Sequence, residues 1–238
     1  VNKPGSIIVQ RIIKRRWAIV WHMGLSLAGL VITVLLSRTI GNWIITPANL
    51  GCILLLLFYS STFKKKFLIG NIIISLLTAW VVFVLYVAEL DITVFAVNAQ
   101  YHAAMTKIFK LAVLYGGFAF VISLVREVVK DMEDVPGDEK FGCRTMPIVW
   151  GIPSSKVFAG VWLLVLILAV LVLFVYALLL GWWLAAIYVL VLVVLPLLQV
   201  LRKLYRAAGP ADFHNVSGLI KLAMLTGILS MMFFKWHI

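Results

Sequence analysis

Residues 161–180 read VWLLVLILAVLVLFVYALLL, a run without a single charged side chain. A helix of about 20 apolar residues is long enough to cross the hydrocarbon layer of a membrane. The next run starts directly after Gly181 and again carries no charge before Arg202. Two such runs joined by so short a connection indicate a tight transmembrane hairpin.

The rest of the chain has the same character. Of its 238 residues 64% are hydrophobic and only 13% are charged, whereas a soluble domain has about 45–50% apolar and about 25% charged residues. With two cysteines, it is also no disulfide scaffold. The apolar residues come in long blocks, which excludes the alternating pattern of a transmembrane β-barrel. We predict an all-α, polytopic transmembrane bundle with seven spans, at residues 17–37, 48–63, 71–90, 108–130, 157–180, 182–201 and 216–234.

Two further expectations follow from the spans and the charges. Pro196 lies inside the sixth span, so a neighbouring helix or a local kink must satisfy the backbone group that it frees. With the N-terminus inside, seventeen of the 21 basic residues lie on the inner side. The net charge of +12 therefore indicates basic cytoplasmic loops in a multi-pass protein of the cell (inner) membrane, not a nucleic-acid partner.

Acidic residues are scarce and gathered in one place. Six of the nine fall within thirteen positions at the cytoplasmic end of the fourth predicted span. Glu127, Asp131 and Asp134 have the spacing of one helix face. Pro136 and the glycine after it predict the end of that helix, with Asp138 in the loop beyond.

Carboxylates that converge at a membrane surface repel one another, and a cation relieves the repulsion. Mg²⁺ prefers oxygen ligands and is commonly held by carboxylates together with substrate phosphates. The alternative is a solvated helix end with Lys130 and Lys140 as counter-charges. The acidic residues alone leave both interpretations open.

A lysine turn at another cytoplasmic end favours the metal interpretation. Residues 59–66 read YSSTFKKK, which taken alone is typical of any inner loop. Opposite a carboxylate cluster, its ammonium groups would complete a diphosphate site, with Mg²⁺ on one side and lysine on the other. Arg126 and Arg144 are candidates for further bidentate contacts.

The segment 126–151, REVVKDMEDVPGDEKFGCRTMPIVWG, resembles the second aspartate-rich motif of the UbiA-type membrane prenyltransferases. The spaced aspartates, the Gly-Asp, the Lys-x-Gly and the Thr-x-Pro occur in the family's order. Residues 59–65 together with Asn71 are similar to the family's loop between its fourth and fifth helices. The opening Asn-Lys-Pro at 2–4 is similar to the loop after the family's first aspartate-rich motif.

This resemblance implies a nine-helix, all-α bundle around a central cavity, with its polar site near the cytoplasmic face. It also implies Mg²⁺ as cofactor and a polyprenyl diphosphate as donor. The implied site residues are metal and diphosphate ligands at Asp131, Asp134 and Asp138, basic loop residues Lys64 and Lys65, their polar neighbours Tyr59 and Asn71, and the motif positions Arg126, Lys140 and Arg144.

The sequence departs from the family in one respect. It has seven predicted spans, and its first aspartate is Asp91. We therefore expect the first aspartate-rich motif and two helices to lie upstream of Val1. On that expectation residues 1–238 are the C-terminal seven helices of a single transmembrane domain, with about half of the metal site.

The acceptor is the least determined part of the prediction. The residues of the motif are most similar to those of family members that transfer geranylgeranyl to a glycerol-phosphate ether lipid. The basic residues that could bind the acceptor phosphate are Arg11, Arg15, Arg16 and Arg144. A 4-hydroxybenzoate or other quinone-precursor acceptor is the alternative. A membrane transporter is the alternative outside enzymes, but the nearly uncharged span centres disfavour it.

Overall fold

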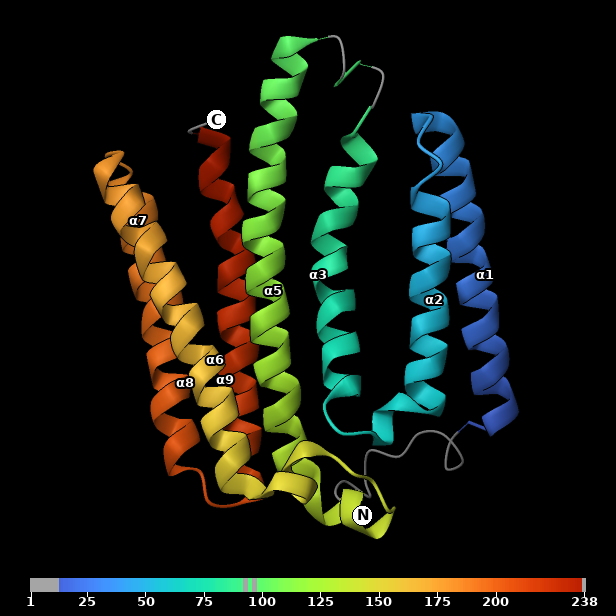
Figure 1. Cartoon of the computed structure of the whole chain (residues 1–238), viewed down its shortest axis with the longest axis vertical. Helices are drawn as coiled ribbons and strands as arrows, with labels where there is room; N and C mark the ends of the chain where they lie inside the picture. Colours follow the sequence, from blue (N-terminus) through green and yellow to red (C-terminus); the bar gives the residue numbers. More distant parts are fainter. Residues whose placement is uncertain (1–12, 92–93, 96–97, 237–238) are drawn as a thin grey trace. The chain divides into compact units, whose positions relative to one another are not determined.

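The computed structural model describes residues 13–91, 94–95 and 98–236, and almost all of them are helical. The all-α prediction is confirmed (Figure 1). The helices are α1 (Arg15–Ile40), α2 (Ile45–Ser61), α3 (Ile69–Glu89), α5 (Ala99–Lys140), α6 (Met146–Leu179), α7 (Trp183–Val189), α8 (Leu195–Arg206) and α9 (Pro210–Leu229). Three shorter helical turns accompany them, at Phe63–Lys65, Leu190–Val194 and Ser230–Trp236.

Six of these helical stretches are long and apolar enough to cross a membrane, so the chain is a multi-pass membrane protein. One of the six is the continuous stretch Trp183–Arg206, formed by α7, the π-helical turn and α8. All seven predicted spans are helical, and α2 is a shorter apolar helix. Helix α5 is longer than predicted because polar residues extend it past the apolar run, and α6 begins earlier because a short helical piece precedes a kink at Gly151.

The described chain divides into two compact units. The first holds residues 1–64 and 80–116, and within it α1 and α2 pack side by side (Figure 1). Ser37 Oγ and Thr46 Oγ1 lie 2.7 Å apart across this pair. Asn49 donates to Thr33 and accepts a hydrogen bond from the Trp80 indole. Such polar contacts hold helices together in lipid, where apolar burial provides little driving force.

The second unit holds residues 65–79 and 117–238, and α6, α8 and α9 lie side by side in it (Figure 1). Its core is built from fully buried aliphatic side chains of four helices. They include Val125 of α5, Leu163 of α6, Leu197 and Leu204 of α8, and Ile220 of α9. This core fixes the end of α5 that carries the acidic residues. The prediction that the whole chain forms one domain stays a prediction.

The predicted end of the acidic helix is wrong, because α5 continues through Pro136. A proline lacks only one backbone donor, so the residues after it can still be helical. The helix stops where Gly142 takes a left-handed φ of 64°. There the Gly142 N–H donates to Glu139 O and the Cys143 N–H to Asp138 O, the pairing of a Schellman cap. Asp138 is therefore on the helix and not in the loop.

The expectation for Pro196 is confirmed. This proline lies in the first turn of α8, directly after the π-helical turn. It cannot donate to the carbonyl of Leu192, four residues earlier. Thr226 of α9 donates its hydroxyl to that carbonyl oxygen at 2.6 Å, so a neighbouring helix satisfies the freed acceptor.

Candidate functional site

The candidate site is a row of three aspartates near the end of α5. Asp131, Asp134 and Asp138 follow one another at intervals of three and four residues on a continuous helix, so they share one face. All three side chains are partly exposed. Because the helix passes through Pro136, the third aspartate is aligned with the other two. We call these three residues the acid face.

Asp131 is the best-positioned member of the acid face. Its Oδ2 accepts a hydrogen bond of 2.8 Å from Asn71 Nδ2. Asn71 is only 8% exposed. Asn71 sits in the first turn of α3, where Ser75 donates to its carbonyl. The negative charges of Asp138 and Glu127 and the positive charge of Lys130 act on Asp131. A fixed carboxylate in a field of like charges favours a bound cation.

Glu127 lies one turn before Asp131 on the same side of α5, but its carboxylate is paired with Arg126 and is not counted in the acid face. Arg126 Nη1 lies 2.6 Å from Glu127 Oε1, and Glu127 is 8% exposed. A buried carboxylate needs such a partner, since an unpaired buried charge is costly. Both residues are therefore engaged with each other in this structure.

The lysine turn is joined to the acidic segment within the second unit. The Arg144 N–H donates to the Lys65 carbonyl at 2.9 Å, which ties the loop after α5 to the turn before α3. Two residues further on, the Phe67 ring packs against Trp150 at 4.7 Å between centroids. The side chains of Lys65 and Arg144 are exposed. The structure therefore brings Lys65, Asn71, Arg144 and the acid face into one region.

The remaining predicted residues are distributed as follows. Tyr59 is half-buried near the end of α2, and Lys64 is exposed in the next turn; both belong to the first unit. Lys140 is exposed at the last residue of α5. Arg11 and the opening segment lie outside the described residues, as does the side chain of Arg15.

A second carboxylate contact in this region was not foreseen. Glu133 is 8% exposed, and its Oε1 lies 3.0 Å from Nδ1 of His214 on α9. The pair joins the acidic end of α5 to the start of α9. The two residues are 81 positions apart, and the motif at 126–151 contains Glu133 but not His214, so no local sequence signal points to the contact.

Among the residues that the structure describes, no three His, Cys, Asp or Glu side chains come close enough to form a metal site. The chemistry of the acid face nevertheless fits part of one. Carboxylate oxygens are the ligands that Mg²⁺ prefers, and the acid face carries three carboxylates on one side of α5. The magnesium site stays a prediction, with the acid face as one side of it.

Fold and site together define a class: a multi-pass helical membrane protein with carboxylates and a basic turn at one end of its spans. The sequence profile of the UbiA prenyltransferase family matches residues 1–225. The chain therefore belongs to the UbiA prenyltransferase family.

Similar proteins agree with this assignment. The digeranylgeranylglyceryl phosphate synthase of Methanosphaera stadtmanae is 23% identical over 232 residues, which cover 97% of this chain and 75% of that protein. The synthase of the same name from Methanothermobacter thermautotrophicus is 32% identical, with 72% of this chain and 54% of that protein covered. For the Thermococcus sibiricus synthase the identity is 29%, and the coverage is 66% and 48%. No solved structure gives a significant match.

Proposed function

We propose that this protein transfers a geranylgeranyl group from its allylic diphosphate to a glycerol-phosphate ether lipid. The observation that carries the proposal is the acid face of α5, fixed through Asn71 and joined by backbone to the lysine turn. Carboxylates beside ammonium groups are the arrangement that a magnesium diphosphate requires. The names of the similar synthases support the lipid acceptor.

Each polar residue then has a distinct task. Asp131, Asp134 and Asp138 would hold Mg²⁺, with Asn71 fixing the first of them. When bound, Mg²⁺ draws electron density from the diphosphate oxygens and stabilises the charge of the leaving group. Lys64 and Lys65 neutralise the remaining oxygens, and Arg144 can form a bidentate contact. Tyr59, Arg126 and Lys140 are the further motif positions of the proposed site, and Arg126 is paired with Glu127.

The reaction exchanges one carbon–oxygen bond for another. The bond between the allylic carbon and the diphosphate breaks, and its electron pair leaves with the diphosphate. The acceptor hydroxyl oxygen forms the new bond, and its proton passes to the departing diphosphate. Water has to be kept from the carbocation-like carbon, which explains why an apolar helical bundle suits this chemistry.

We place the site at the cytoplasmic face of the cell membrane. Seventeen of the 21 lysines and arginines lie on the side of the acid face when the spans alternate, and basic loops remain in the cytoplasm. This orientation presents the site to a water-soluble diphosphate headgroup while the prenyl chain stays in lipid.

The test is a prenyl-transfer assay of the full natural protein in liposomes, with geranylgeranyl diphosphate, Mg²⁺ and radiolabelled acceptor. We expect Asp131→Asn, Asp134→Asn and Asp138→Asn each to lower turnover by about 100-fold or more, because each removes charge that the leaving group depends on. Chelation of Mg²⁺ should abolish turnover. Glu139→Gln is the matched control, since Glu139 is exposed on the same turn of α5 but outside the acid face.

Each asparagine variant should have the same gel-filtration volume and melting temperature as the parent protein, so that a loss of turnover reflects the site and not the fold. Wild-type turnover in all three would refute the site. Efficient prenylation of 4-hydroxybenzoate, with none of the glycerol-phosphate lipid, would replace the proposed acceptor while leaving the transferase assignment intact.

A further inference from the structure

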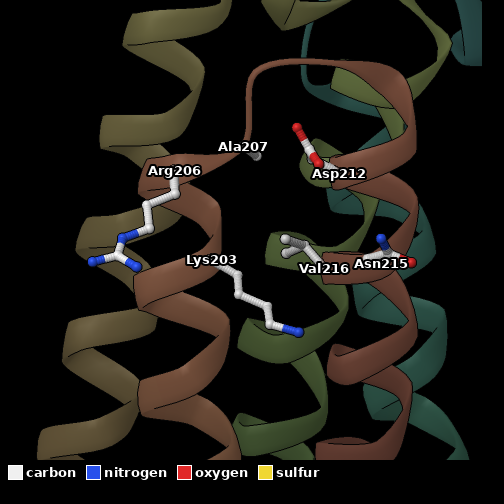
Figure 2. Close-up of a pocket in the computed structure, with 6 residues that line it drawn as sticks. All are labelled: Lys203, Arg206, Ala207, Asp212, Asn215 and Val216. Carbon is white, nitrogen blue, oxygen red and sulfur yellow. The ribbon is translucent and has the colours of Figure 1, made fainter.

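The second unit contains a cavity that the proposed reaction does not use. It has a volume of about 210 Å³ and lies between the end of α8 and the start of α9 (Figure 2). Its lining residues are Lys203, Arg206, Ala207, Asp212, Asn215 and Val216. The cavity therefore has donors on both helices and an apolar floor, since Ala207 and Val216 are buried.

The side-chain donors that line this cavity can bind a ligand without breaking a contact within the protein. Within the described residues, Lys203, Arg206 and Asn215 have no side-chain hydrogen bond or ion pair, and all three are exposed. In Figure 2 the Lys203 side chain extends from α8 toward α9, whereas the Arg206 side chain points away from α9 on the other side of α8. Lysine and arginine together offer both a point charge and a planar fork, which suits phosphate oxygens.

The one carboxylate among the lining residues, Asp212, is hydrogen-bonded to the backbone of the turn before α9. Asp212 Oδ2 accepts hydrogen bonds from the N–H groups of Ala208 at 2.9 Å and Gly209 at 3.2 Å. These bonds cap the start of α9 and hold the carboxylate against the turn. Lys156 of α6 fixes the same turn by donating to the Ala207 carbonyl. With two cationic side chains and this one carboxylate among its lining residues, the cavity has a net positive charge.

Its place along the helices indicates the kind of anion. Both helices are membrane-span candidates, Trp183–Arg206 and Pro210–Phe233, and the cavity lies where one ends and the other begins. This is the level of the lipid headgroups. From Asn215, α9 continues with the exposed Leu222 and Leu229 at intervals of seven residues, which keeps all three on one face.

We propose that this cavity binds the phosphate of an anionic membrane glycerophospholipid, with an acyl chain lying along Leu222 and Leu229. Basic pockets between the cytoplasmic ends of spans suit such headgroups. Lys203 contacts the phosphate oxygens, the exposed Arg206 side chain rotates toward them, and the Asn215 amide donates to the same headgroup. None of the acid-face residues lines this cavity, and the proposal does not depend on prenyl transfer.

Native mass spectrometry of the full natural protein, delipidated in detergent and titrated with phosphatidylglycerol or phosphatidylcholine, tests the proposal. We expect tight, saturable binding of about one phosphatidylglycerol, and an affinity at least about tenfold weaker in Lys203→Gln/Arg206→Gln. The matched control is Arg202→Gln/Lys221→Gln, which removes two exposed basic side chains outside the cavity and should bind like the parent protein. Lys203→Arg/Arg206→Lys keeps the charge and should also bind.

Three outcomes would overturn the proposal. Equal loss in the control pair would show that net charge alone attracts the lipid. Equal affinity for phosphatidylcholine would remove the requirement for an anionic headgroup. Displacement of phosphatidylglycerol by millimolar inorganic phosphate would assign the cavity to free phosphate. Because no readout depends on turnover, an inactive enzyme leaves this test unaffected.

Discussion

At the scale of single residues, one hydrogen bond holds the acid face in place. Asn71 Nδ2 donates to Asp131 Oδ2 at 2.8 Å from a buried position on α3. Partners of this kind orient a metal ligand without touching the metal, and their loss typically costs about 10- to 100-fold in metal affinity or activity. Asn71 is thus a positioning residue in the proposed site.

We predict that Asn71→Ala raises the Mg²⁺ concentration for half-maximal prenyl transfer by about tenfold, because Asp131 loses its orientation. The measurement is a magnesium titration of the transfer rate in liposomes. Asn49→Ala is the control: Asn49 also bonds across helices, but in the first unit, so its loss should lower stability without moving the magnesium curve. Equal curves for Asn71→Ala and the parent protein would argue against the role of Asn71.

At the scale of helices, two prolines have different consequences. Pro136 stays inside α5, which keeps the acid face continuous. Pro196 follows a π-helical turn, and the acceptor that it leaves on Leu192 is satisfied by Thr226 of α9. A buried carbonyl without a partner is costly in lipid. The Thr226 hydroxyl therefore adds a polar contact to the apolar packing of α8 against α9.

We predict that Thr226→Val lowers the free energy of unfolding by about 1 kcal/mol, since interhelical hydrogen bonds in membranes have about this value. The measurement is unfolding in mixed detergent micelles. Thr106→Val is the control, because Thr106 bonds only to the His102 carbonyl of its own helix. A loss as small as that of the control would mean that the Leu192 carbonyl finds another partner.

At the scale of the whole molecule, the distribution of basic residues orients the spans. We predict that Lys140 lies on the cytoplasmic side and Gln100, at the other end of α5, on the opposite side. With Cys52 and Cys143 replaced by serine, intact cells should label Gln100→Cys with a membrane-impermeant maleimide, and Lys140→Cys only after permeabilisation. The reverse pattern would invert the topology and move the acid face away from the cytoplasm.

Much of this architecture could be predicted because its determinants are local. The charge-free run at 161–180 and its counterparts predict helices, since a helix is the structure that satisfies its own backbone in lipid. The motif at 126–151 likewise indicates the family without knowledge of any contact. The error at Pro136 has a local cause too: a proline weakens a helix, but packing of the second unit decides whether the helix ends there.

The sequence by itself therefore determined that the chain folds into apolar helices and which residues form the acidic motif, because hydropathy and spacing act between near neighbours. Only the tertiary structure decided that Asn71 fixes Asp131, that His214 meets Glu133, and that α8 and α9 enclose a basic cavity. These contacts join residues tens of positions apart, and their geometry depends on how the helices pack.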